Sequence, residues 1–129
     1  MSTMSPRLIA DLIGAPYAER GRGPHAFDCE GLFLEVQRRR GYAGSVPPAA
    51  ATEQRARAWM HIAVGEWREL SRPQAGCAVF FAADLHVGTM YDRSRFLHTT
   101  SEFGEAYLET LDSPFWCGKT PRFYDWMPA

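Results

Sequence analysis

Cys29 is the residue whose place in the sequence most suggests chemistry. It follows Asp28 directly and opens an amphipathic run within residues 25–41, HAFDCEGLFLEVQRRRG. Asp28 is a good N-cap, so the sequence predicts a helix that begins at Cys29. Unpaired N–H groups and the positive end of the helix dipole favour a thiolate in that turn and can hold an oxyanion. Cys29 is therefore a candidate nucleophile, with a small core residue as the alternative.

A thiol nucleophile needs a base, and the base needs a partner that orients it. His86 opens one predicted strand, and His98 lies in the next strand, after a tight turn. If these strands form a hairpin, the two imidazoles lie on one face as cross-strand neighbours. His98 would then hold the tautomer of His86, and Gly88 would keep the strand open to an approaching substrate. The sequence thus predicts a site made of Cys29, His86 and His98.

Other polar residues have weaker claims to a role. His25 stands in a glycine-rich loop, where a solvated side chain is the simpler interpretation and substrate contact the alternative, and His61 lies in a predicted helix and is expected to be structural. A zinc site from Cys29, His86 and His98 is conceivable by ligand type, but no Cys-x-x-Cys or His-x-x-x-His spacing supports it. There is no dinucleotide fingerprint or recognised phosphate-binding loop, so we expect no cofactor.

The elements that must position these residues follow from periodicity and breakers. Ser5, Asp28 and Thr52 are candidate caps for helices at about 6–13, 29–40 and 53–70. Strand composition appears at residues 77–82, 86–91, 95–99 and 121–126, and residues 105–111 fit either a strand or a short helix. Helices followed by short strands and tight turns predict an α+β fold with the helices packed on an antiparallel sheet.

The composition limits the class of protein. The 129 residues fit a single domain over 1–129, and 46% hydrophobic residues suffice for a packed core. A net charge of −1 argues against nucleic acid or an anionic membrane as the main partner. Three cysteines cannot all pair within the chain, which suggests reduced thiols. The N-terminal segment has only a short apolar run, so we expect no signal peptide and no membrane insertion.

Two stretches resemble the signatures of the NlpC family of cell-wall cysteine peptidases. PYAERGRGPHAFDCEGL resembles the first signature, in which a Tyr precedes a Gly-containing loop, an Asp-Cys pair, one variable residue and Gly-Leu. HVGTMYDRSRFLHTT resembles the second, a His-Val-Gly strand, a turn and a third polar residue, commonly His, on the following strand. Both stretches appear in the family order, and the resemblance extends over roughly residues 6–126.

This resemblance implies a papain-like α+β fold and hydrolysis of an amide in the peptidoglycan stem peptide, often the D-glutamyl to diaminopimelate bond. It implies that Cys29 is the nucleophile, that His86 is the general base and later the acid, and that His98 orients His86. Tyr17 matches the loop tyrosine of the family, whose hydroxyl can bind substrate or polarise its carbonyl. Asp28 matches the aspartate before the nucleophile, which we interpret as the helix cap.

Two positions depart from the family pattern. Glu30 follows the nucleophile, where the family usually has a non-acidic residue. A carboxylate pointing inward there would raise the thiol pKa, so we expect Glu30 to point to solvent or to a cationic group. Cys77 stands in AGCAVFF, where family members commonly have Gly-Asp, and we expect it to be a core residue.

The C-terminal stretch LDSPFWCGKTPRFYDWM resembles phage and prophage members, which often end in a Pro-Arg-Phe-Tyr-like strand. Without a signal peptide, this predicts an enzyme made in the cytoplasm and carried in a phage tail or tail-like particle, with tail-tip or hub proteins as partners. Trp116 and Trp126 are expected in the core or a groove wall, or alternatively to dock a partner. Two other functions stay open: a structural tail-tip component with vestigial catalysis, and a related Cys-His amidase or acyltransferase.

Overall fold

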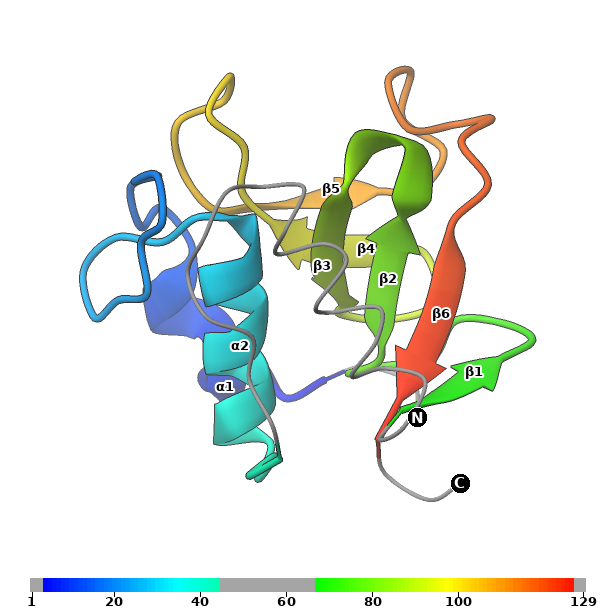
Figure 1. The fold of residues 1–129 in the computed structure, drawn as a ribbon, viewed down its shortest axis with the longest axis horizontal. Helices are drawn as coiled ribbons and strands as arrows, with labels where there is room; N and C mark the ends of the chain where they lie inside the picture. Colours follow the sequence, from blue (N-terminus) through cyan, green and yellow to red (C-terminus); the bar gives the residue numbers. More distant parts are fainter. Residues whose placement is uncertain (1–3, 45–66, 127–129) are drawn as a thin grey trace.

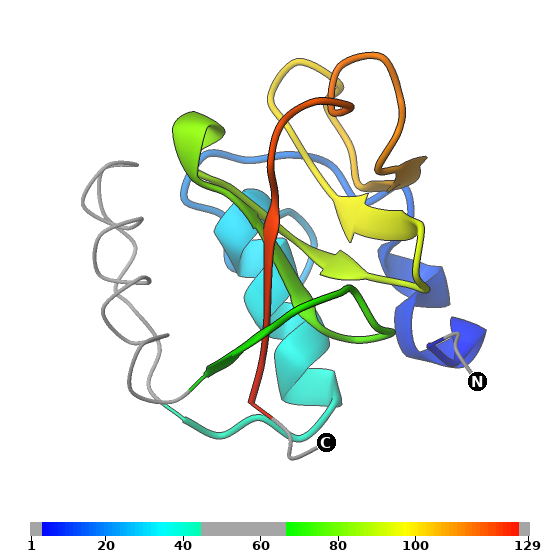
Figure 2. The same ribbon diagram turned by 90° about the vertical axis from the view of Figure 1, so that its right-hand side faces the viewer.

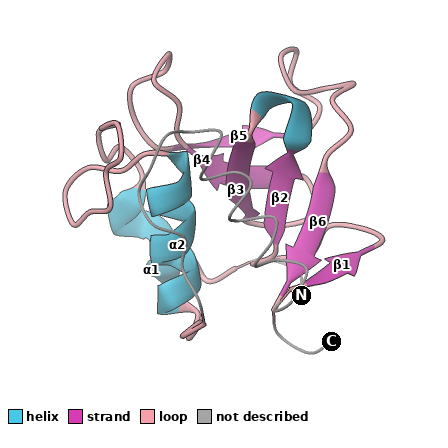
Figure 3. Cartoon of the chain, viewed as in Figure 1, coloured by secondary structure: helices cyan, strands magenta, loops and turns pink. Residues whose placement is uncertain are grey.

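The computed structural model describes residues 4–44 and 67–126. Its helical elements are α1 (Pro6–Ile9), the 3-10 turn η1 (Ala10–Leu12), α2 (Cys29–Arg39) and the 3-10 turn η2 (Ala82–Asp84). Its strands are β1 (Arg68–Leu70), β2 (Ala78–Phe81), β3 (His86–Met90), β4 (Arg95–His98), β5 (Tyr107–Thr110) and β6 (Arg122–Asp125). Figure 3 shows how helix and strand divide the chain.

The six strands form one sheet in the order β1-β6-β2-β3-β4-β5, with antiparallel neighbours throughout. Figure 1 shows α1 and α2 together on one side of this sheet, and Figure 2 looks across β6 and β1 with α2 behind them. The predicted α+β fold with helices packed on an antiparallel sheet is therefore confirmed. Helix α2 packs mainly against β3, which starts with one of the candidate histidines.

Helix α2 forms where capping and periodicity predict it. The Asp28 carboxylate (Oδ1) accepts a hydrogen bond of 2.7 Å from the Gly31 N–H and so satisfies one of the open donors of the first turn. Arg38 and Arg39 lie in the last turn, where positive charge is favoured. Gly41 has a φ of +105°, a left-handed conformation that ends the helix at low cost.

The first predicted helix is shorter than expected, and no side-chain hydrogen bond caps its start. Pro6 occupies the first turn as predicted, but α1 ends at Ile9 and the chain continues as the 3-10 turn η1. Ser5 precedes the helix without a side-chain capping bond. The backbone N–H of Met4 instead donates to the Tyr91 carbonyl at 2.8 Å, which ties this segment to the end of β3.

The predicted third helix, 53–70, lies mostly outside the described residues, and its final part is wrong. Residues 68–70 form β1, paired with β6, and the Arg122 guanidinium holds Glu69 across that pair at 2.7 Å. Tertiary pairing therefore decides the conformation of a segment whose sequence is compatible with a helix. The segment 105–111, left open between strand and helix, contains β5, which pairs with β4.

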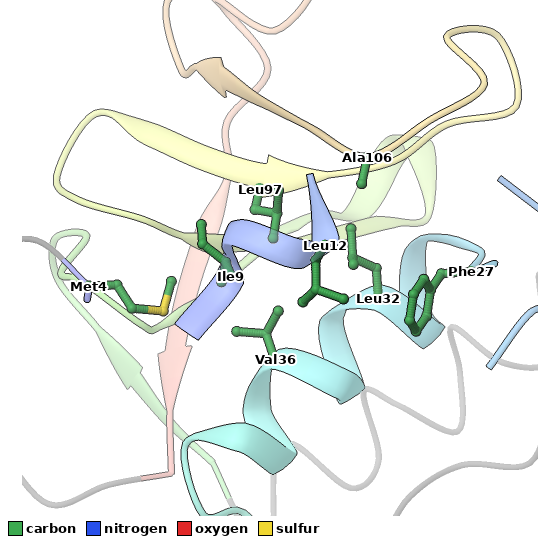
Figure 4. Packing of buried hydrophobic residues seen from close by; sticks show 8 residues of the cluster. All are labelled: Met4, Ile9, Leu12, Phe27, Leu32, Val36, Leu97 and Ala106. Carbon is green, nitrogen blue, oxygen red and sulfur yellow. The ribbon is translucent and has the colours of Figure 1, made fainter. Parts of the chain in front are cut away.

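Burial between the helices and the sheet fixes the position of α2. Figure 4 shows the cluster between α1, α2 and the sheet, to which Leu32 and Val36 of α2 and Leu97 of β4 belong. Its buried members are Met4, Ile9, Leu12, Phe27, Leu32, Val36, Leu97 and Ala106. On the sheet, Cys77 is fully buried in a separate cluster, as predicted for a core residue, and burial raises the pKa of its thiol to about 12.

Candidate active site

Three chain positions meet at one end of the sheet because of the topology. Cys29 is the first residue of α2, His86 is the first of β3, and His98 is the last of the antiparallel neighbour β4. Figure 1 shows α2 and β3 starting at the same end of the molecule. A pocket of about 580 Å³ opens there, and Cys29, His86 and Tyr17 all line it. The remaining lining comes from residues 84–85, 99–103, 107, 109 and 115–116.

The loop before α2 holds the first turn through close backbone packing. The Asp28 N–H donates to the Gly21 carbonyl at 3.1 Å, so the loop crosses directly over the start of the helix. A Cβ at Gly31 would lie 2.0 Å from that carbonyl oxygen. Glycine two positions after the cysteine is therefore required by this packing, which gives the Gly of the Asp-Cys-x-Gly-Leu stretch a physical reason.

Arg22 from the same loop meets the two acidic residues that flank Cys29. Its guanidinium contacts Asp28 at 2.9 Å and Glu30 at 2.8 Å. Glu30 is only 4% exposed, so this carboxylate is buried against a cation. The expectation that Glu30 meets a cationic group is confirmed, and Arg22 offsets negative charge on both sides of the thiol.

The predicted hairpin brings the two histidines into hydrogen-bond contact. Nε2 of His86 lies 2.8 Å from Nδ1 of His98. Both side chains are buried, with His86 6% and His98 0% exposed. Because Nε2 of His86 faces His98, Nδ1 is the ring nitrogen of His86 that His98 does not engage.

Gly88 has a different role from the one expected. A Cβ at this position would lie 2.9 Å from the Leu97 carbonyl oxygen and 3.2 Å from the His98 Cβ. The space above Gly88 is thus filled by β4, and the glycine makes room for His98, not for a substrate. The prediction that it keeps the strand open to substrate is wrong.

Glu109 of β5 completes a chain of contacts behind the histidines, and the sequence analysis missed it. Its Oε1 lies 2.8 Å from Nε2 of His98. The same oxygen accepts hydrogen bonds from the Tyr107 hydroxyl and the Trp116 indole N–H, each at 2.8 Å, and Oε2 accepts one from the Ser113 hydroxyl at 2.8 Å. Strand alternation is the signal that could have found it, because Tyr107 and Glu109 share a face only if this segment is a strand.

Aromatic rings enclose the histidine pair. The resulting burial controls whether the two imidazoles carry a charge. His86 stacks on Trp116 with centroids 5.0 Å apart, and the His98 ring lies 4.3 Å from that of Phe96. Burial, together with a smaller effect of the neighbouring His98, lowers the pKa of His86 to about 3. Burial also lowers the pKa of His98 to about 4, although Glu109 acts in the opposite direction. Both rings are therefore neutral at neutral pH.

The other candidate residues divide between the pocket and its surroundings. Tyr17 lines the pocket, and its backbone N–H donates to the Gly104 carbonyl at 2.9 Å. His25 is exposed and outside the pocket lining, in agreement with a solvated loop side chain. Trp116 forms part of the pocket wall, and the Trp126 indole N–H donates to Gln37 at 2.9 Å. His61 lies outside the described residues.

Two further properties concern the described part of the chain, residues 4–44 and 67–126. No group of three or more His, Cys, Asp or Glu side chains there is arranged to hold a metal ion. Within the same residues, every helix is too short or too polar to cross a membrane.

No family model matches the sequence, and no curated protein matches it. Solved structures do share its fold. The NlpC/P60 domain of the peptidoglycan hydrolase SagA superposes with a TM-score of 0.63 at 19% identity, over 94% of each chain. A staphylococcal protein described as similar to a lipoprotein of the NLP/P60 family, from Staphylococcus aureus subsp. aureus Mu50, gives 0.62 at 23% identity over 95% of this chain. NlpC2 from Trichomonas vaginalis gives 0.64 at 15% identity over 93% of this chain.

These likenesses define the fold as that of NlpC/P60 domains. The present chain spans 42% of the staphylococcal protein and 45% of the trichomonad one, so in both it corresponds to less than half of the longer chain.

Proposed function

We propose that this chain is a cysteine peptidase that cuts an amide of the bacterial cell wall. The observation that carries the proposal is that Cys29 and His86 line one pocket, with His98 hydrogen-bonded to Nε2 of His86. A thiol, a base and an orienting group in this order are the parts that nucleophilic catalysis needs. The NlpC/P60 fold supports the cell wall as the substrate, since one protein with this fold is named a peptidoglycan hydrolase.

The proposed mechanism uses the ring nitrogen of His86 that His98 leaves unengaged. Nδ1 of His86 takes the proton of the Cys29 thiol, and the thiolate attacks the carbonyl carbon of the scissile amide. Backbone N–H groups at the start of α2 stabilise the oxyanion, and the Tyr17 hydroxyl polarises the same carbonyl. The imidazolium then protonates the departing amine, and water, with His86 again as base, hydrolyses the thioester and restores Cys29.

The substrate that we propose is the peptidoglycan stem peptide, with the D-glutamyl to diaminopimelate bond as the specific amide. Mass spectrometry of muropeptides, after incubation with the unaltered chain or with Cys29→Ala, tests this. We expect new stem-peptide fragments only with the unaltered chain. Cys117→Ala is the matched control, because Cys117 is an exposed thiol outside the pocket lining. Identical profiles for the unaltered chain and Cys29→Ala would refute the peptidase assignment.

We also propose, from the sequence resemblance of the C-terminal stretch, that the protein is carried in a phage tail or tail-like particle. The Arg-Phe-Tyr part of that stretch lies in β6, between β1 and β2 in the sheet, so its role in the described structure is to complete the fold. Proteomic analysis of purified particles from producing cells tests the proposal. Absence of the protein from the particles, with the enzyme present in the cells, would refute it.

A further inference from the structure

We propose that Glu109 is a positioning residue of this site, which fixes the tautomers of both histidines so that Nδ1 of His86 is the basic nitrogen offered to Cys29. The inference rests on the proposed function for its catalytic meaning. Its structural content, the direction of two hydrogen bonds, follows from the ionised state of Glu109, the neutral state of both rings and the two contacts of 2.8 Å that link the three residues.

The argument starts from what a carboxylate can do. Hydrogen bonds from Tyr107, Ser113 and His98 outweigh the effect of burial and hold the pKa of Glu109 below its usual range, so at neutral pH the group is ionised. An ionised carboxylate only accepts hydrogen bonds. In the 2.8 Å contact between His98 and Glu109, Nε2 of His98 must therefore carry the hydrogen.

The direction of the second hydrogen bond follows. A neutral imidazole has one N–H, so Nδ1 of His98 has a lone pair and can only accept. Nε2 of His86, 2.8 Å away, must then be the donor. The lone pair of neutral His86 is left on Nδ1, which is the nitrogen that can take the proton of a thiol. The charge of Glu109 thus selects the active tautomer two side chains away.

The carboxylate is itself held in place from several directions. Tyr107 donates to it from the same strand, and Ser113 and Trp116 donate to it from the segment after β5. The Trp116 ring also stacks on His86, so one residue packs against the base and anchors the carboxylate. These contacts fix the orientation of Glu109 independently of His98.

Glu109 also supplies negative charge when His86 becomes protonated. Within residues 4–44 and 67–126, the other titratable groups around the histidine pair are Cys29 on α2 and Tyr107 on β5, and Asp84 and Glu102 line the same pocket. Asp84 pairs with Lys119 at 3.2 Å, and Glu102 is exposed on the loop after β4. Glu109 is therefore the carboxylate in hydrogen-bond contact with the histidine pair, and it keeps its own charge throughout the reaction.

Two substitutions separate the hydrogen bond from the charge. Glu109→Gln keeps an amide oxygen for His98, Tyr107 and Trp116 and can donate to the Ser113 hydroxyl, but it removes the charge. Glu109→Ala removes both. Glu105→Gln is the matched control, because Glu105 is an exposed acidic residue of the same segment that lies outside the pocket lining.

The first measurement needs no substrate. In ¹⁵N-histidine NMR of the full chain at neutral pH, we expect the hydrogen on Nε2 of both His86 and His98 in the unaltered protein, Glu109→Gln and Glu105→Gln. Glu109→Ala should show the Nδ1–H form of His98.

The pH dependence of Cys29 alkylation by iodoacetamide, resolved from Cys117 by peptide mapping, also needs no substrate. Its midpoint should shift upward by about one pH unit in Glu109→Gln, since the imidazolium loses its carboxylate.

The second measurement uses wall digestion. Glu109→Ala should lower kcat about 100-fold with KM changed less than about twofold, the range lost when a general base is misplaced. The kcat of Glu109→Gln should lie between those of Glu109→Ala and the unaltered chain.

If the unaltered chain digests walls and Glu109→Ala keeps both the unaltered kcat and the unaltered tautomers, the inference is overturned while the proposed function stands. If the unaltered chain digests nothing, the proposed function fails, and the NMR and alkylation results still decide the inference. Should Glu109→Ala not fold, Glu109→Gln decides: an unchanged kcat with an unshifted alkylation profile refutes the role of the charge.

Discussion

Lowering the pH from 8 to 5 is expected to weaken this fold through the buried pair His86 and His98. Burial places the folded-state pKa of these residues at about 3 and about 4, against 6.5 for an ordinary histidine. Between these values the unfolded chain binds protons that the folded chain does not. The folded state therefore has its full stability above pH 6.5 and loses it as the pH falls toward the folded-state values.

The size of the effect follows from the shifts. At pH 5 an unfolded histidine is nearly fully protonated while both folded ones are mostly neutral, so each lowers the free energy of unfolding by about 2 kcal/mol relative to pH 8. The pair together contributes about 4 kcal/mol, with a slope near pH 5 of about 2.5 kcal/mol per pH unit. A domain of this size has a total of roughly 5–15 kcal/mol, so the change is a large part of its stability.

Urea unfolding followed by circular dichroism at pH 8, 6.5 and 5 measures this directly. Carboxyl groups with lowered pKa, such as Asp92 and Glu109, lose their stabilising contribution only below their ordinary values of 3.8 and 4.5, so the interval from 6.5 to 5 reports on histidines. In His98→Gln, which removes one titrating ring, the slope should fall to about half. An unfolding free energy that differs by less than about 1 kcal/mol between pH 8 and pH 5 would refute the buried neutral pair.

Three substitutions test the support of the site. Asp28→Ala removes the cap of α2 and should lower the free energy of unfolding by about 1–2 kcal/mol in urea titrations; an unchanged value would contradict the capping role. Gly31→Ala places a Cβ 2.0 Å from the Gly21 carbonyl oxygen, so we expect a loss above about 3 kcal/mol or failure to fold, and a stable, soluble variant would show that the loop can yield. Leu32→Ala opens a cavity at a 1% exposed position and should cost about 2–5 kcal/mol, whereas Ile13→Ala, at a 47% exposed position, should change the melting curve little.

The sequence could predict that the two histidines lie close together, because the limits of the two strands that carry them can be recognised in it. A tight turn separates two short β-rich runs, and antiparallel pairing then places the start of one strand beside the end of the next. Asp28 likewise marks the start of α2, since a cap, a period of 3.6 residues and a C-terminal glycine all agree. Local signals determine these elements, and so they also determine which end of the sheet holds the candidate site.

Glu109 and Arg22 could not be predicted in the same way. Residues 105–111 fit a strand or a helix by periodicity, and only a strand places Glu109 toward His98. Arg22 lies in a loop whose path depends on packing against Gly31, a contact that no local pattern encodes. The conformation of residues 68–70 was mispredicted for a related reason, because pairing with β6 decides it.

The two carboxylates Glu30 and Glu109, the first buried and the second half-buried, illustrate how the charge of the site is arranged. Glu30 follows Cys29 in sequence, and Arg22 holds it at 2.8 Å, so the negative charge nearest to Cys29 along the helix is met by a cation. Glu109 has no such cation in hydrogen-bond contact among the interactions of the described residues; neutral donors and His98 hold it instead. Its charge is thus available to the histidine pair. In the mechanism that we propose, the carboxylate that Arg22 offsets beside the thiol and the ionised carboxylate behind His98 would both favour transfer of the thiol proton to His86.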